Sequence, residues 1–185
     1  GAGHPGRRAA APKREPRSCR AAPGVVGGPL NAVSFPIGAC DTHMHIYDGR
    51  YPVAPSAILR PPDAAVADYR LVQAELGLDR VVVVQPTTYG LDNTCTLDAV
   101  SAIGPGARAI VVVDGSVSLT ELDRLTRLGS RGARFHQMPG GAVGWEALAS
   151  VASRIAPFGW HVQVQMNGRD LADRFDLLAS LPVPV

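Results

Sequence analysis

Ala39-Cys40-Asp41-Thr42-His43-Met44-His45 is a short segment in which a predicted strand runs into two histidines. Successive side chains of a strand point to opposite sides, so His43 and His45 should share one face while Met44 faces away. We expect Asp41 on that same face, where it could orient the imidazoles. Two imidazoles at one strand end can ligate a metal, polarise a carbonyl or move protons near neutral pH. The alternative is a pair of incidental histidines.

Later segments repeat the strand pattern at intervals along the chain. The clearest of them, at residues 80–85 and 109–113, are apolar and rich in β-branched residues, as strands that are buried on both faces require. The later segments span residues 80–85, 109–113, 132–135 and 160–166, and residues 182–185 have the pattern of a sixth strand that is just beginning.

Helical patterns separate these predicted strands. We expect Asp63 to cap the first helix, in which Tyr69, Val72 and Leu76 share one face, and Gly77 to end it. Later helical stripes fall near residues 97–103, 122–128, 148–155 and 171–178, and a capping box at 118–121 precedes the second of them.

This alternation is typical of repeated βα units, which force parallel strands joined by right-handed crossovers. Two architectures satisfy it: an eight-stranded barrel and a doubly wound open sheet. A complete barrel usually needs about 250 residues, whereas residues 36–185 supply only 150. We therefore predict an α/β chain of the (β/α)8 TIM-barrel family, truncated to about its first five βα units.

The first part of the chain has a different composition from the rest. Residues 1–35 are rich in Arg, Pro and Gly and are expected to form a disordered leader, which leaves the domain to residues 36–185. A basic arm of this kind could contact nucleic acid or a membrane surface, but we interpret it as a solvated leader and expect neither partner. The leader lacks a compact apolar export segment, which predicts a cytoplasmic protein.

The three cysteines argue against two classes of site. Cys19, Cys40 and Cys95 show no CxxC spacing, so we expect neither a disulfide framework nor a zinc knuckle. The sequence also has no run of about 18 apolar residues, which excludes a membrane-spanning helix.

Further site residues are expected after the later strands, because barrel active sites form at the carboxyl ends of the strands. Arg134, near the end of the fourth predicted strand, is the best candidate to bind a substrate carboxylate through two parallel hydrogen bonds. A surface ion pair is the alternative for this residue. Thr87, in the loop after the second strand, could contact a polar substrate, although a plain connecting loop is equally consistent with the sequence.

The residues after the fourth and fifth strands bear on metal binding. A two-metal hydrolytic site would need a Lys or acidic ligand after the fourth strand and a His after the fifth. His136 follows the fourth strand, whereas Gln163 and Gln165 occupy the fifth. We therefore expect no dinuclear site. The alternative is a single divalent metal such as Zn, held by His43, His45 and residues that this sequence does not contain.

Two motifs are similar to those of the amidohydrolase superfamily. They are Cys40-Asp41-Thr42-His43-Met44-His45 and Val84-Gln85-Pro86-Thr87-Thr88-Tyr89-Gly90-Leu91-Asp92-Asn93. The resemblance is to the branch of 2-pyrone-4,6-dicarboxylate lactonase and D-galactarolactone isomerase. Gly132-Ala133-Arg134 with Pro139-Gly140-Gly141-Ala142-Val143 resembles the isomerase more. The resemblance covers about residues 38–185, which corresponds to the N-terminal part of these proteins.

The resemblance implies an eight-stranded barrel that acts on carboxylated lactones, in this branch without a required metal. On that basis we expect no required cofactor. It implies that His43 and His45 polarise the lactone carbonyl. It also implies a His after the sixth strand and an Asp after the eighth, and neither position exists in this sequence. The substrate-binding residues that the resemblance implies are Arg134, Thr87, Tyr47 and Tyr51.

We therefore expect an amidohydrolase-family hydrolase of a carboxylated lactone or cyclic ester, in sugar-acid or aromatic catabolism. The alternatives are a lactone isomerase similar to D-galactarolactone isomerase, a metal-dependent decarboxylase of the same superfamily, and an inactive fragment that lacks the strand-eight Asp. A small-molecule substrate is the only partner expected, and the sequence leaves the oligomeric state unknown. We expect the 185-residue chain alone neither to close a barrel nor to turn over substrate.

Overall fold

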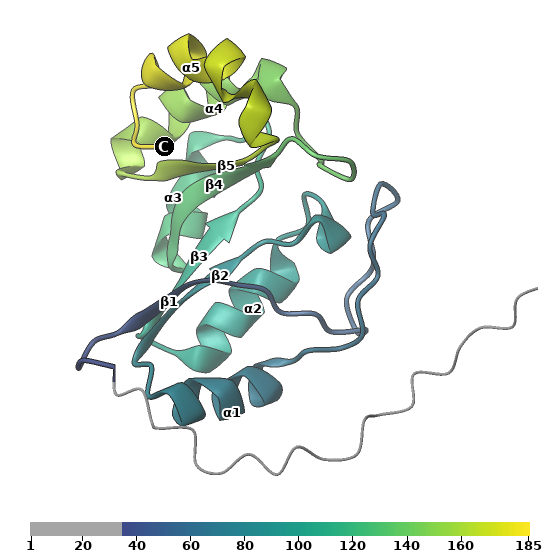
Figure 1. Cartoon of the computed structure of the whole chain (residues 1–185), viewed down its shortest axis with the longest axis vertical. Coiled ribbons are helices and arrows are strands. Elements are labelled where there is room, and N and C mark those ends of the chain that lie inside the picture. The colour runs from purple at the N-terminus through teal and green to yellow at the C-terminus, as the bar shows by residue number, and fades with distance from the viewer. Residues whose placement is uncertain (1–34) are drawn as a thin grey trace, which may run out of the picture. The chain divides into compact units, whose positions relative to one another are not determined.

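The computed structural model describes residues 35–185, so the predicted leader, except for its last residue, lies outside the described residues. Within the described part, strands and helices alternate along the chain (Figure 1). The elements are β1 (Cys40–Met44), α1 (Val66–Leu76), β2 (Arg80–Val84), α2 (Thr94–Ile103), β3 (Ala107–Val111), α3 (Leu119–Arg127), β4 (Ser130–His136), α4 (Leu148–Ile155), β5 (His161–Gln165) and α5 (Leu171–Ala179). Short 3-10 turns lie at Thr87–Tyr89 (η1), Trp145–Ala147 (η2), Ala156–Phe158 (η3) and Gly168–Asp170 (η4).

The five strands form one parallel sheet in which neighbours in sequence are neighbours in space, in the order β1-β2-β3-β4-β5. A doubly wound sheet reverses its strand order at a switch point, so this sequential order rules that architecture out. The described part is a half-barrel, and the prediction of a truncated (β/α)8 fold is confirmed.

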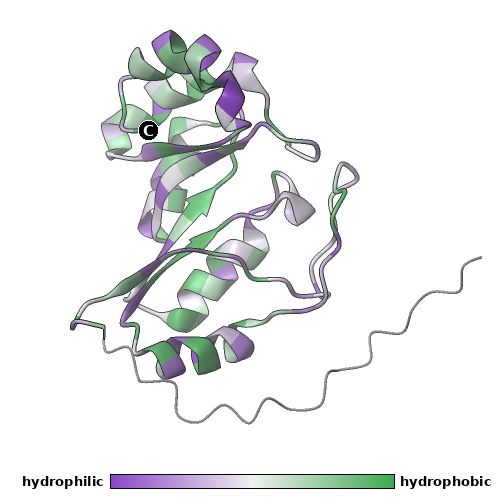
Figure 2. Cartoon of the chain, in the orientation of Figure 1, coloured by the Kyte–Doolittle hydropathy of each residue, from purple (hydrophilic) through white to green (hydrophobic). Residues whose placement is uncertain are grey.

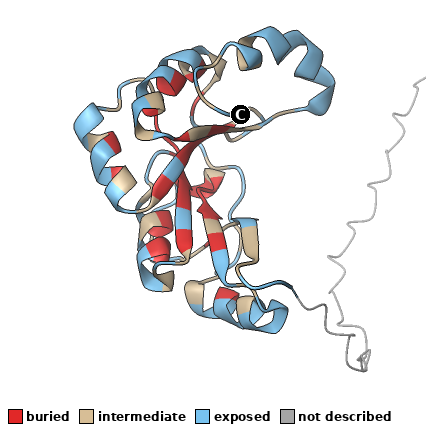
Figure 3. Ribbon diagram, turned by 90° about the vertical axis from the view of Figure 1, so that its left-hand side faces the viewer, coloured by how far each residue is buried: buried red, intermediate tan, exposed pale blue. Residues whose placement is uncertain are grey.

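The helices cover one face of this sheet. Side chains from that face, such as Val83 of β2, form a single hydrophobic core with the inward sides of the helices. Val84 and Ile110 are also fully buried but lie outside this core cluster, because alternation places them on the opposite face. We call that opposite face the inner face. Hydrophobic residues gather in β3 (Figure 2), and buried residues gather in the strands and the adjoining helix turns (Figure 3).

The first helix differs from its prediction at both its cap and its apolar stripe. Ala65, not Asp63, is the N-cap residue, and Asp68 supplies the carboxylate that accepts the Ala65 N–H, at 2.8 Å. Asp63 instead accepts the N–H of Gly49 at 2.8 Å. Tyr69 is the one stripe residue that is buried, whereas Val72 and Leu76 are exposed. Gly77 ends the helix in the left-handed region, as predicted.

Residues 182–185 are not a strand of the sheet, although they lie against its edge. The Val162 N–H of β5 donates to the carbonyl of Pro184 at 2.8 Å. Val183 also packs against the hydrophobic core. The predicted start of a sixth strand is therefore represented by this one backbone hydrogen bond beside β5.

The predicted capping box of α3 is only half formed. The Ser118 hydroxyl accepts the N–H of Glu121 at 3.1 Å, which satisfies one of the free N–H groups of the first turn. The Glu121 carboxylate turns outward and pairs with Arg124 at 2.7 Å. None of the helices in the described part is long and apolar enough to cross a membrane.

Replacing Ser118 by Ala should lower the free energy of unfolding by about 1 kcal/mol, because it removes the acceptor of the Glu121 N–H. Thr120→Ala, on an exposed residue of the same first turn, is the matched control and should change it by less than about 0.5 kcal/mol. Urea denaturation of both variants measures the difference, and an equal loss in the two would contradict this role of the cap.

Candidate active site

His43 and His45 converge on the inner face at the carboxyl end of β1. Their rings meet edge to face, with centroids 5.0 Å apart and planes at 84°. His43 Nδ1 lies 3.4 Å from the side-chain amide of Gln163 on β5, and His45 Nε2 lies 3.4 Å from Arg134 on β4. Strands distant in sequence thus bring their side chains to the two imidazoles, as the alternation of β1 predicts.

Asp41 does not join them, and the expectation that it would share their face was wrong. The pairing of β1 with β2 shifts between Asp41 and Met44, so an extra residue interrupts the alternation. One Asp41 oxygen accepts the hydroxyl of Tyr69 on α1 at 3.2 Å, on the helix-covered face, and the other accepts the backbone N–H of His43 at 3.1 Å. Asp41 therefore anchors the backbone of the strand end and does not contact the imidazoles.

His45 has a defined tautomer. Its Nδ1 lies 2.7 Å from the carbonyl oxygen of Val84, which can only accept, so Nδ1 carries the proton. In the neutral ring Nε2 then carries no proton, and its lone pair faces the guanidinium of Arg134. Burial lowers the pKa of His45 to about 4, against the opposing effect of the Val84 carbonyl, and the Arg134 cation lowers it further. Burial also lowers the pKa of His43, assisted by Arg134.

Arg134 is a buried cation surrounded by neutral acceptors. Only 4% of the residue is exposed. Its Nη1 donates to the backbone carbonyl of Gln85 at 3.0 Å, and its Nη2 donates to the side-chain oxygen of Gln165. None of the ion pairs among residues 35–185 includes Arg134. Burial lowers the pKa of this guanidinium, and its Nε has no hydrogen-bond partner in the described part.

Thr87 and Tyr47 lie beside this cluster. Thr87 begins η1 and lines a small hollow, together with Arg134 and His136, whose volume of about 10 Å³ is room for about one water molecule. The Tyr47 ring packs against that of His45, with centroids 6.1 Å apart. Burial raises the pKa of Tyr47, against the opposing effect of the Arg134 cation. Both residues thus lie where a ligand at Arg134 could reach them.

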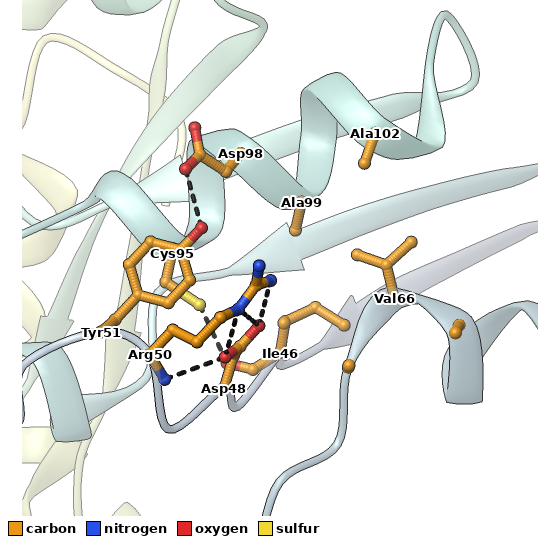
Figure 4. A pocket seen from close by; sticks show the side chains of 11 residues that line it. Ile46, Asp48, Arg50, Tyr51, Val66, Cys95, Asp98, Ala99 and Ala102 are labelled. Atoms are coloured by element: carbon orange, nitrogen blue, oxygen red, sulfur yellow. Dashed lines mark hydrogen bonds and ion pairs between the residues drawn. The ribbon is translucent and has the colours of Figure 1, made fainter.

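Tyr51 lies in a different place. Its hydroxyl donates to Asp98 of α2 at 2.7 Å, and it lines a pocket of about 330 Å³ between the loop after β1 and the helices α1 and α2 (Figure 4). This pocket also receives Ile46, the residue next to His45, which strand alternation turns the other way. The structure therefore does not bring Tyr51 to the histidines.

The described residues do not by themselves supply the ligands of a divalent metal. Among residues 35–185, no group of three or more His, Cys, Asp or Glu side chains could hold a metal ion. The charged group that faces His45 Nε2 is the Arg134 guanidinium, whose positive charge would repel a second cation.

The sequence did not assign roles to three further polar residues at the cluster. Gln165 accepts from Arg134 and also lies 3.1 Å from His136 Nδ1, and Gln163 reaches His43. Gln163 Oε1 is another buried atom without a partner in the described part. The signal was present in the sequence, because two glutamines spaced two apart near the end of an apolar strand must point to one face.

Comparisons with known proteins identify relatives of this chain. The sequence profile of the amidohydrolase family matches residues 40–185. D-galactarolactone isomerase from Agrobacterium fabrum is 37% identical over 150 residues, which cover 80% of this chain and 51% of that protein. The 2-pyrone-4,6-dicarboxylate hydrolase from Comamonas testosteroni is 36% identical over 155 residues, which cover 82% of this chain and 51% of that protein.

A solved structure has a similar fold over most of this chain. A crystal structure from Agrobacterium tumefaciens superposes with a TM-score of 0.78 at 36% identity, and covers 82% of this chain and 56% of that one. The chain thus spans about half the length of the relatives that it matches.

The lowered pKa of His45 predicts a pH-dependent stability. The folded-state pKa of about 4 lies below the ordinary value of 6.5, so the unfolded chain takes up this proton first. The contribution of His45 should be complete above about pH 6.5 and should be lost as the pH falls toward 4. In His45→Asn the side-chain amide can still donate to Val84 but cannot titrate, so urea denaturation should show a shallower fall over this window. Parallel curves for the two proteins would contradict the assignment.

Proposed function

Because this chain belongs to the amidohydrolase family, we propose that it supplies the substrate-anchoring part of an enzyme that hydrolyses a carboxylated lactone or a related cyclic ester. The observation that carries the proposal is the buried Arg134 guanidinium, which has no carboxylate partner in the described part and lies beside His45 at the strand ends.

A buried charge is normally paired, because its removal from water is not offset by neutral acceptors alone. Arg134 keeps its charge in the interior of the half-barrel with carbonyl, amide and imidazole acceptors as its partners. A carboxylate on the ligand would supply the missing negative charge through charge-assisted hydrogen bonds. This favours a substrate that carries a carboxylate.

His43 and His45 are suited to different roles. Gln163 donates to His43 Nδ1, so the neutral ring of His43 carries its proton on Nε2 and can donate it to a substrate carbonyl. His45 already donates to Val84, and its unprotonated Nε2 holds Arg134. In this proposal His43 polarises the lactone carbonyl, and His45 positions the guanidinium and remains neutral.

The proposed reaction is acyl transfer to water. The water oxygen forms a bond to the lactone carbonyl carbon, and the carbonyl electron pair moves to its oxygen. The His43 N–H and the nearby Arg134 cation stabilise that oxyanion. When the carbonyl re-forms, the ring C–O bond breaks and the ring oxygen takes up the proton that the attacking water has lost, which yields a hydroxy acid.

Lactone isomerisation is the second candidate, and the 37% identity to D-galactarolactone isomerase favours it specifically. The same oxyanion forms, but a hydroxyl of the substrate attacks in place of water, and the ring closes at a new position. A metal-dependent decarboxylase is disfavoured by the donor set of the described residues. The expected independence from a cofactor and the cytoplasmic location stay predictions.

Arg134→Met should lower kcat/KM by about 100-fold or more, since it removes the hydrogen bonds of a buried cation to the substrate carboxylate. Arg131→Met, on an exposed arginine of the same strand, is the matched control and should leave kcat/KM unchanged. For the assay, residues 36–185 are joined to the second half of D-galactarolactone isomerase. The conversion of aldarolactones and pyrone dicarboxylates in H₂¹⁸O is followed by ¹H NMR, and ¹⁸O in the product is measured by mass spectrometry.

Incorporation of ¹⁸O into a ring-opened product would support hydrolysis, and a shifted ring without ¹⁸O would support isomerisation. No reaction with any carboxylated lactone, at a stability equal to that of the parent isomerase, would refute the proposal. The 185-residue chain is assayed alone in parallel, because turnover by that chain would contradict the expectation that it is inactive by itself.

A further inference from the structure

Gln165 places one oxygen between two donors of the candidate site. Its side-chain Oε1 accepts from Arg134 Nη2 and lies 3.1 Å from His136 Nδ1. An amide oxygen can only accept, so the His136 proton lies on Nδ1 and points at the same oxygen. Two N–H groups from β4 therefore converge on a single acceptor from β5.

Of the two N–H groups along one edge of the Arg134 guanidinium, only one has a hydrogen-bond acceptor. The Nε–H and one Nη2–H of a guanidinium lie parallel along one edge, which matches the two oxygens of a carboxylate. Gln165 occupies Nη2, whereas the buried Nε has no hydrogen-bond partner in the described part. A buried N–H without a partner is unfavourable, and a second oxygen beside the first would remove that penalty.

The Gln165 side chain is held by fewer hydrogen bonds than the side chain of another glutamine nearby, Gln85. Gln85 is fully buried, donates to two backbone carbonyls and accepts from Thr96, so it is fixed in place. Gln165 is exposed, and its amide nitrogen has no hydrogen bond to the described residues. Rotation toward solvent would break only the contacts of its oxygen with Arg134 and His136.

We propose that Gln165 Oε1 occupies the position of one oxygen of a substrate carboxylate, and that the carboxylate displaces this side chain to bind Arg134 through Nε and Nη2 and His136 through Nδ1. This inference rests on the proposed function and names the anion subsite of the same site. Gln165 is then a specificity-determining residue. A carboxylate displaces the neutral amide because charge-assisted hydrogen bonds are stronger, whereas an uncharged ligand gains no such advantage.

The test measures binding of glutarate, a simple dicarboxylate, to the 185-residue chain by isothermal titration calorimetry and NMR. Gln165→Ala should bind glutarate about fivefold more tightly, because no side chain has to be displaced. Gln165→Glu should bind at least tenfold more weakly, because its own carboxylate fills the subsite. Gln73→Ala, on α1, is the matched control and should bind like the parent chain.

The role of His136 has its own pair of variants. His136→Ala should weaken glutarate binding several-fold, and His136→Asn, whose amide N–H replaces Nδ1–H, should restore most of it. Glutaramide, the uncharged diamide, should not compete in any variant. Thermal unfolding of each variant shows whether a loss of binding reflects a loss of folded protein.

Weaker glutarate binding by folded Gln165→Ala would overturn the proposal, as would the absence of binding by both that variant and the parent chain. Equal affinities for glutarate and glutaramide would also overturn it. These outcomes are independent of turnover. The predicted affinity pattern without lactone turnover would leave the subsite standing and refute the proposed function, and turnover without the pattern would refute the subsite alone.

Discussion

Parallel pairing of consecutive strands is the constraint on which the rest of this structure depends. Each helical crossover returns the chain to the same end of the sheet, so the carboxyl ends of β1, β2, β4 and β5 meet at one rim. Residues 89 positions apart in sequence, His45 and Arg134, come within 3.4 Å of each other at that rim. The helices cover the other face and supply the hydrophobic core, which leaves the inner face free for polar side chains.

A second feature of the site is the irregular end of β1. A regular strand would place Asp41 beside the histidines, where its negative charge could pair with Arg134. The shifted register turns that carboxylate to Tyr69 on the helix side. The charge of Arg134 is thus left without a carboxylate partner in the described part, and this imbalance is the physical basis on which we propose a carboxylated substrate.

The neutral groups around Arg134 have a common character: each accepts a hydrogen bond and none carries a negative charge. The Gln85 carbonyl and His45 Nε2 hold one end of the guanidinium, and Gln165 holds part of its side edge. Such a surrounding orients the cation without neutralising it. Burial lowers the pKa values of His43 and His45, and the same cation lowers them further, which favours the neutral forms of both imidazoles.

The sequence by itself determined the number and order of the βα units, the face shared by His43 and His45, and the position of Arg134 at a strand end. These features follow from local periodicity, because the side-chain alternation of a strand and the apolar stripe of a helix are set by backbone geometry. Only the tertiary structure decided the partners of Asp41, Asp63, Tyr51 and Gln165. Each partner lies on another element, and its distance depends on strand register, burial and competing hydrogen bonds, which no local pattern encodes.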